Sequence, residues 1–109
     1  MNVAAGNLFA GDELDRVRLG KRVPLRGDVQ VYVPAMDMRI PTTGKDISEG
    51  GCFVRSQVLL PVGTEVRIRI AGAERETMDV AARVVRVVPE GASAGMAFVF
   101  VGEASATAA

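Results

Sequence analysis

Two arginines, Arg18 and Arg22, stand four positions apart in a basic stretch near the start of the sequence. At this spacing both side chains lie on one side of the chain, about 6 Å apart on a helix or about 13 Å apart in a strand. Guanidinium groups bind phosphate oxygens in bidentate fashion, match the O6/N7 edge of guanine and stack on bases. The pair suits a ligand that combines phosphate with guanine, although two solubilising charges on an arm would show the same spacing.

A second candidate segment, Asp46-Ile47-Ser48-Glu49-Gly50-Gly51, joins two apparent strands later in the chain. Asp and Ser favour turns because their side chains bond nearby backbone groups, and glycine lets a ligand approach the backbone closely. Asp46 can accept from the N1–H and N2–H₂ donors of guanine, Ser48 can donate to a phosphate or a base, and Gly51 leaves room. The alternative interpretation is a strand-to-strand turn that binds nothing.

The composition limits the chemistry. The chain has 109 residues, a formal net charge of zero and no histidine. Without histidine it lacks the commonest acid–base group and the commonest metal ligand, and nothing of that kind can activate Ser48. An enzyme would therefore have to use carboxylates, lysine, tyrosine or the single thiol, and we expect no metal site and no cofactor. Cys52 is the single cysteine, so no intramolecular disulfide can form, and we expect a buried structural thiol.

The ends of the chain are rich in small residues. The first residues lack the basic and apolar regions of a secretory signal, and no apolar run approaches the ~20 residues that span a bilayer. These patterns predict a cytoplasmic protein with a flexible N-terminal arm at 1–15, one domain at 16–102 and a tail at 103–109.

The elements between the two ends have the alternating pattern of strands. Valines at 29, 31 and 33 alternate with polar residues, and so do the apolar residues at 66, 68 and 70. Further strands are predicted at 39–45, interrupted by Pro41, and at 52–55, 78–88 and 96–101. The alternation slips around Arg83–Arg86, which predicts a bulge or bend. Six or seven short strands indicate an all-β, closed or nearly closed antiparallel barrel, with Phe53, Phe98 and Phe100 in its core.

The two candidate segments together resemble the PilZ domain family of bacterial cyclic di-GMP receptors. Arg18-Leu19-Gly20-Lys21-Arg22 is similar to the family's Arg-x-x-x-Arg motif, and Asp46 to Gly51 to its Asp/Asn-x-Ser-x-x-Gly motif. Leu60-Pro61-Val62-Gly63-Thr64 and the segment from Gly95 to Val101 resemble later family landmarks. The resemblance covers about residues 16–102. It implies a six-stranded antiparallel split barrel without catalysis, here with a short or absent C-terminal helix.

The resemblance also implies the ligand, cyclic di-GMP, and its binding residues. The ligand residues would be Arg18, Arg22, Asp46, Ser48 and Gly51, with Arg16, Val17, Lys21 and Gly50 as auxiliary positions. Val17 stands where an arginine favours a stacked pair of ligand molecules in the family, so its apolar side chain suggests a single one. Ala97 departs from the family pattern, which often has a second glycine there.

The expected function is a receptor or adaptor that relays the second-messenger signal to a partner protein when its N-terminal arginine arm becomes ordered. Such modules act in motility or biofilm regulation. The alternative is a PilZ-like interaction adaptor, for example in pilus or flagellar control, that does not depend on nucleotide. Nucleic acid is a weaker candidate because the net charge is zero. We expect a monomer or weak homodimer with no membrane span.

Overall fold

The fold is built almost entirely from strands, in which core-facing and solvent-facing residues alternate. The computed structural model describes residues 21–25, 27–71, 76–102 and 105–108. The strands, in chain order, are β1 (Val23–Pro24), β2 (Asp28–Val33), β3 (Met38–Ile47), β4 (Gly51–Arg55), β5 (Glu65–Ala71), β6 (Glu76–Val88), β7 (Gly95–Phe100) and β8 (Ser105–Ala108). A short 3-10 turn, η2 (Pro34–Met36), joins β2 to β3. In this part of the chain there is no α-helix.

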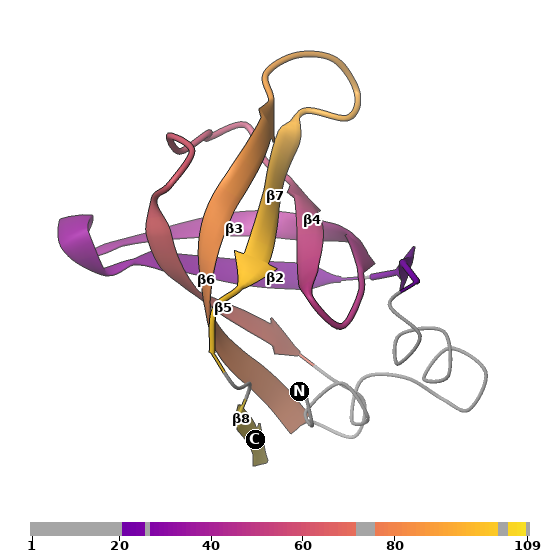
Figure 1. The fold of residues 1–109 in the computed structure, drawn as a ribbon, viewed down its shortest axis with the longest axis vertical. Coiled ribbons are helices and arrows are strands. Elements are labelled where there is room, and N and C mark those ends of the chain that lie inside the picture. The colour runs from indigo at the N-terminus through magenta and orange to yellow at the C-terminus, as the bar shows by residue number, and fades with distance from the viewer. Residues whose placement is uncertain (1–20, 26, 72–75, 103–104, 109) are drawn as a thin grey trace.

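Six strands close into an antiparallel barrel, as the sequence predicted. The hydrogen-bonded order is β3-β2-β5-β6-β7-β4, and β4 pairs with β3 to complete the circle. In Figure 1 the long β2–β3 hairpin runs horizontally, while β4, β6 and β7 run roughly vertically. β1 adds to β3, and β8 pairs with β6. Closure leaves the six barrel strands with few unpaired edges.

Strand β3 is longer than expected because Pro41 does not interrupt it. Pro41 lies opposite Gln30 of β2, two residues before Thr43, where the pairing of β3 with β4 begins. One edge of β3 is therefore not paired with β4 at this point. A proline, which has no N–H to donate, is tolerated at such an edge.

The core is a single apolar cluster inside the barrel. Strands β2 and β5 supply the predicted alternation, with Val29, Val31 and Val33 buried beside Ile68 and Ile70. Phe98 is fully buried in this cluster, and Phe100 packs against it while partly exposed. Burying aliphatic side chains at about 25 cal/mol per Å² of apolar surface is the main term that stabilises such a barrel.

Phe53 is buried, as predicted, but it lies outside this cluster. It stands between Cys52 and Val54, which both point into the cluster, and successive side chains of a strand point to opposite faces. Phe53 is therefore on the outer face of β4, yet it is only 4% exposed. Two long basic side chains, Lys45 and Arg86, lie over its ring there.

Two β-bulges shift the strand register. One lies between Val84 and Arg86 of β6, where the slip in alternation predicted it, and the bulge is confirmed. The other lies between Gly44 and Asp46 of β3 and was not predicted. A bulge adds a residue to one strand and changes the direction of its side chains, and bulges often lie near functional sites.

The end of the chain contributes a strand. Residues 105–108, in the segment expected to form a tail, are β8, antiparallel to the start of β6. Figure 1 shows β8 at the bottom, beside that part of β6. No helix among the described residues has the length and apolar character needed to cross a membrane.

Candidate functional site

The two sequence motifs meet because β1 pairs with β3. Val23 lies opposite Ile47 and Pro24 opposite Asp46, which places the end of the first motif beside the start of the second. Arg22, immediately before β1, donates from Nη1 to Oδ1 of Asp46 at 2.6 Å. These residues are 24 positions apart in the chain. The barrel thus brings together one arginine and one carboxylate that the sequence predicted as ligand residues.

The Arg22–Asp46 ion pair is exposed enough to exchange partners. The Arg22 side chain is 48% exposed and that of Asp46 is 26% exposed. Pairs of this kind contribute about 0.2–1 kcal/mol to stability because water competes for both groups. A ligand that offers phosphate to the guanidinium and N–H donors to the carboxylate can therefore replace the pair at small cost.

The turn after β3 presents its polar groups beside this pair. The backbone N–H of Ser48 donates to the carbonyl of Gly51 at 2.8 Å, and the N–H of Phe100 donates to the carbonyl of Gly50 at 2.8 Å. The hydroxyl of Ser48 also donates to Gly51, but at 3.5 Å, which is long for an O–H···O bond. The backbone bonds fix the turn, whereas the half-buried hydroxyl can rotate toward a ligand.

Gly51 has a structural reason to be glycine that involves no ligand. A Cβ built on Gly51 would overlap the carbonyl oxygen of Phe98 on the neighbouring strand β7. Gly50 differs, since a Cβ there would meet nothing within 4 Å. The close approach of β4 to β7 thus requires the second glycine, while the first is conformationally ordinary and exposed.

Phe53 forms part of a hollow next to the motif residues. The register places Asp46 opposite Phe53, Phe53 opposite Ala97, and Ala97 opposite Arg86, in one row across β3, β4, β7 and β6. The hollow has a volume of about 280 Å³. Its lining includes Asp46, Phe53 and Arg86, together with Arg22 and Lys45.

Two cations cover the Phe53 ring. The Lys45 ammonium lies 5.2 Å and the Arg86 guanidinium 5.5 Å from the ring centroid, both within the range of a cation–π contact. Lys45 is the extra residue at the β3 bulge, and Arg86 is the first residue paired after the β6 bulge. Both bulges therefore direct a basic side chain to the same aromatic ring.

Sequence reasoning missed Lys45, Phe53 and Arg86 as site residues. Phe53 was hidden in an apolar run, Cys52-Phe53-Val54, in which both strand faces are apolar. Arg86 could have been found from the break in the alternation of apolar and polar residues that predicted the β6 bulge. A bulge changes the direction of the side chains near it. The alternation of apolar and polar residues shows no comparable break at Lys45.

The hollow carries a net positive charge. Among the residues that the structure describes, three cations, Arg22, Lys45 and Arg86, line it with one carboxylate, Asp46, for a formal charge of +2. Arg22 holds Asp46, while Lys45 and Arg86 lie over the aromatic ring. A small dianion with at least one flat ring would match both the charge and the stacking surface.

Cys52 lies behind the site but does not take part in it. Burial raises the pKa of the Cys52 thiol to about 12, against a smaller lowering effect of Arg22 and a further increase from Asp46. A thiol with this pKa is protonated and unreactive near neutral pH. Among the described residues, no group of three or more Cys, Asp or Glu side chains could hold a metal ion.

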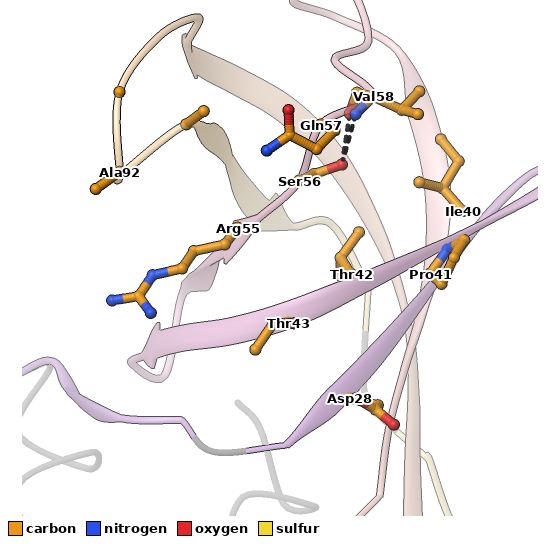
Figure 2. Close-up of a pocket in the computed structure, with 12 residues that line it drawn as sticks. Asp28, Ile40, Pro41, Thr42, Thr43, Arg55, Ser56, Gln57, Val58 and Ala92 are labelled. Carbon is orange, nitrogen blue, oxygen red and sulfur yellow. Dashed lines mark hydrogen bonds between the residues drawn. The ribbon is translucent and has the colours of Figure 1, made fainter.

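A wider hollow on another part of the surface contains none of the motif residues. It measures about 550 Å³ and lies between residues 40–43 of β3, residues 55–58 and the loop at 91–94. Figure 2 shows Arg55 pointing away from Thr42, and Ser56 bonded to the backbone of Val58. Among the described residues its charged lining is one cation, Arg55, and one carboxylate, Asp28, so it fits a dianion less well than the hollow at Asp46.

The structure describes only some of the other residues predicted for the site. Arg16, Val17 and Arg18 lie outside the residues that the structure describes. Lys21 is described and exposed, next to Arg22. The structure therefore brings Arg22, Asp46, Ser48 and the two glycines of the turn together.

The comparison with known families agrees with this geometry. The model of the PilZ domain family matches residues 16–108, most of the chain, including both motifs and all of the barrel. A comparison with curated protein sequences gives no match. Such domains are binding or adaptor modules and generally receptors for cyclic di-GMP. The closed barrel, the two motifs that meet on it and the family match show that the chain belongs to the PilZ domain family.

Proposed function

We propose that this protein is a cyclic di-GMP receptor whose site is the hollow between Arg22, Asp46 and Phe53. The observation that carries the proposal is the Arg22–Asp46 pair, in which the two motifs meet at 2.6 Å beside a hollow of formal charge +2. Cyclic di-GMP carries two phosphodiester charges and two guanine bases. One molecule would therefore neutralise the hollow.

Each group in the hollow has a matching group on the ligand. The carboxylate of Asp46 accepts from the N1–H and N2–H₂ donors of a guanine, and Arg22 moves from Asp46 to a phosphate or to the O6/N7 edge. Ser48 donates to a phosphate or base. The exposed Arg86 guanidinium, which lies over the buried Phe53 ring, offers a flat surface on which a base can stack.

Arg18 is within reach of the same ligand. It precedes Arg22 by four residues, and four residues of any conformation span at most about 14 Å. We propose that Arg18 and Arg22 clamp the ligand against the fixed turn from Asp46 to Gly51. The ligand would thereby fix the N-terminal arginine segment against the barrel, and a partner protein would respond to this change.

Titration calorimetry with cyclic di-GMP tests the assignment. Saturable heat at tens of micromolar protein supports it. If the protein instead captures a partner equally well with and without nucleotide and gives no heat with cyclic di-GMP, it is an adaptor that does not depend on nucleotide.

Replacing Arg86 distinguishes the proposed stacking surface from the motif residues alone. We expect Arg86→Ala to weaken cyclic di-GMP binding about five- to 30-fold, because the variant removes one of the three cations among the described lining residues and a stacking group worth about 1–2 kcal/mol. Calorimetric titration measures the change. Arg69→Ala is the matched control, since it removes an exposed arginine that is paired with Asp79 and lies outside the hollow. Equal affinity of Arg86→Ala and Arg69→Ala would remove Arg86 from the site.

A further inference from the structure

A second basic surface lies on the outer face of β2, β3 and β5. Tyr32 of β2 is opposite Arg39 on β3 and opposite Arg67 on β5, and Gln30 is opposite Arg69. The residues between them on β2 and β5 are buried in the core, so this row faces outward. None of these side chains lines the hollow at Asp46. We call these five residues the arginine face.

One carboxylate holds two of the arginines. Arg67 donates to Oδ1 of Asp79 from Nε at 2.9 Å and from Nη2 at 2.6 Å, and Arg69 donates from Nη2 to Oδ2 at 3.3 Å. A guanidinium has five N–H donors, and these bonds use two from Arg67 and one from Arg69. Arg67 is 48% exposed and Arg69 62% exposed, so both groups also face solvent.

Arg39 adds a third cation beside an aromatic ring. Its guanidinium lies 5.4 Å from the centroid of the Tyr32 ring, and the Tyr32 hydroxyl donates to Oδ1 of Asp37 at 3.0 Å. The hydrogen bond fixes the ring in place. Arg67, Arg69 and Asp79 line the same hollow as Tyr32 and Arg39.

The hollow on this face is the size of one side chain. It measures about 150 Å³ and its lining includes Tyr32, Arg39, Arg67 and Arg69. At about 30 Å³ per water, this volume holds about five waters, comparable to the five heavy atoms of a glutamate side chain beyond Cα. The hollow is therefore large enough for one carboxylate side chain.

A partner cannot add a strand to β2 or β5. β2 lies between β3 and β5, and β5 lies between β2 and β6, so neither strand has an unpaired edge over the paired residues. A partner that covers Tyr32, Arg67 and Arg69 is therefore recognised by side chains on the face of the sheet rather than by backbone pairing to these two strands. Arginine is well suited to this because its planar group binds carboxylates in bidentate fashion.

We propose that the arginine face docks an acidic segment of a partner protein and seats one of its carboxylate side chains over Tyr32. Among the described residues, three arginines set against Asp79 and the adjoining Asp37 give the surface a formal charge of +1 on a chain whose net charge is zero. The complementary partner is therefore a short run of acidic residues. Arg39 and Asp46 are seven residues apart on β3, about 23 Å in a strand, so a partner and a ligand at Asp46 can be bound together.

A hexaglutamate peptide with a fluorescent label probes this surface directly. We expect saturable binding by fluorescence anisotropy at low ionic strength, weakening as salt is added. Arg39→Gln and Arg69→Gln should each weaken it about two- to fivefold, and the double variant about tenfold, because each exposed charge pair contributes about 0.2–1 kcal/mol. Arg83→Gln is the matched control, an exposed arginine on β6 that pairs with Glu65 and lies outside the hollow.

Three results would overturn the proposal. The first is no saturation at millimolar peptide, and the second is an equal loss of affinity in Arg83→Gln, which would show general charge attraction. The third is tighter binding of a six-nucleotide oligothymidylate than of the peptide, which would indicate nucleic acid. In Arg69→Gln the affinity for cyclic di-GMP and the circular dichroism spectrum should stay unchanged. Its loss of peptide affinity is then confined to the arginine face.

Discussion

Arg22→Ala is expected to lower the affinity for cyclic di-GMP about 100-fold, past the range of a calorimetric titration at tens of micromolar protein. Hydrogen bonds to charged groups contribute about 1.5–3 kcal/mol, or about 10- to 100-fold in affinity. Arg22 also orients Asp46, whose Oδ1 it holds at 2.6 Å, so the variant disturbs two ligand contacts. The expected loss is therefore at the upper end of this range.

The fold should survive this substitution. The Arg22 side chain is 48% exposed and its ion pair contributes at most about 1 kcal/mol to stability. Circular dichroism and the melting temperature check this, with Arg69→Ala as a control that removes an exposed arginine outside the hollow at Asp46. Arg22→Lys keeps the charge without the bidentate geometry and should retain only part of the affinity. An affinity for cyclic di-GMP unchanged in Arg22→Ala would remove Arg22 from the site.

Gly51→Ala should destabilise the protein strongly, while Gly50→Ala should not. The new methyl group at Gly51 would overlap the carbonyl oxygen of Phe98, so β4 and β7 would have to separate. Overpacking of this kind costs about 1–3 kcal/mol, and a clash with backbone belongs at the upper end. For a domain of this size, about 2–3 kcal/mol corresponds to a fall in melting temperature of about 10 °C or more.

Gly50→Ala is the matched control because the same methyl group there meets nothing within 4 Å. Its melting temperature should stay within a few degrees of wild type, since exposed substitutions usually change stability by less than about 0.5 kcal/mol. Thermal denaturation followed by circular dichroism measures both variants. If both variants melted alike, the close approach of β4 to β7 would not be what requires glycine at 51. The comparison also separates stability from any ligand contact of this turn.

The barrel itself could be predicted from sequence because its strands alternate regularly. Valines at 29, 31 and 33 and apolar residues at 66, 68 and 70 all face the core. The slip near Arg86 predicted the bulge that the structure contains. Pro41 was misleading, since its effect on a strand depends on whether the neighbouring edge is paired, and a local pattern does not contain that information.

The site could be predicted only where its residues form a motif. Arg22 and Asp46 are 24 residues apart, and their ion pair depends on the pairing of β1 with β3. Phe53 was assigned to the wrong face because its strand is apolar on both sides. Lys45 is the extra residue of one bulge and Arg86 follows the other, and both side chains lie over the ring. These side chains come together at one hollow because of the pairing register of several strands. No single segment of the sequence specifies that register.

Calorimetric titration of the wild-type protein with cyclic di-GMP tests the central claim most directly, because it reports affinity and stoichiometry together. The hollow of formal charge +2 matches the two phosphodiester charges of one ligand. We predict saturable binding of one cyclic di-GMP per chain, with GMP, which has a single base and no phosphodiester, binding far more weakly. No heat above buffer at tens of micromolar protein, or equal binding of GMP, would contradict the account.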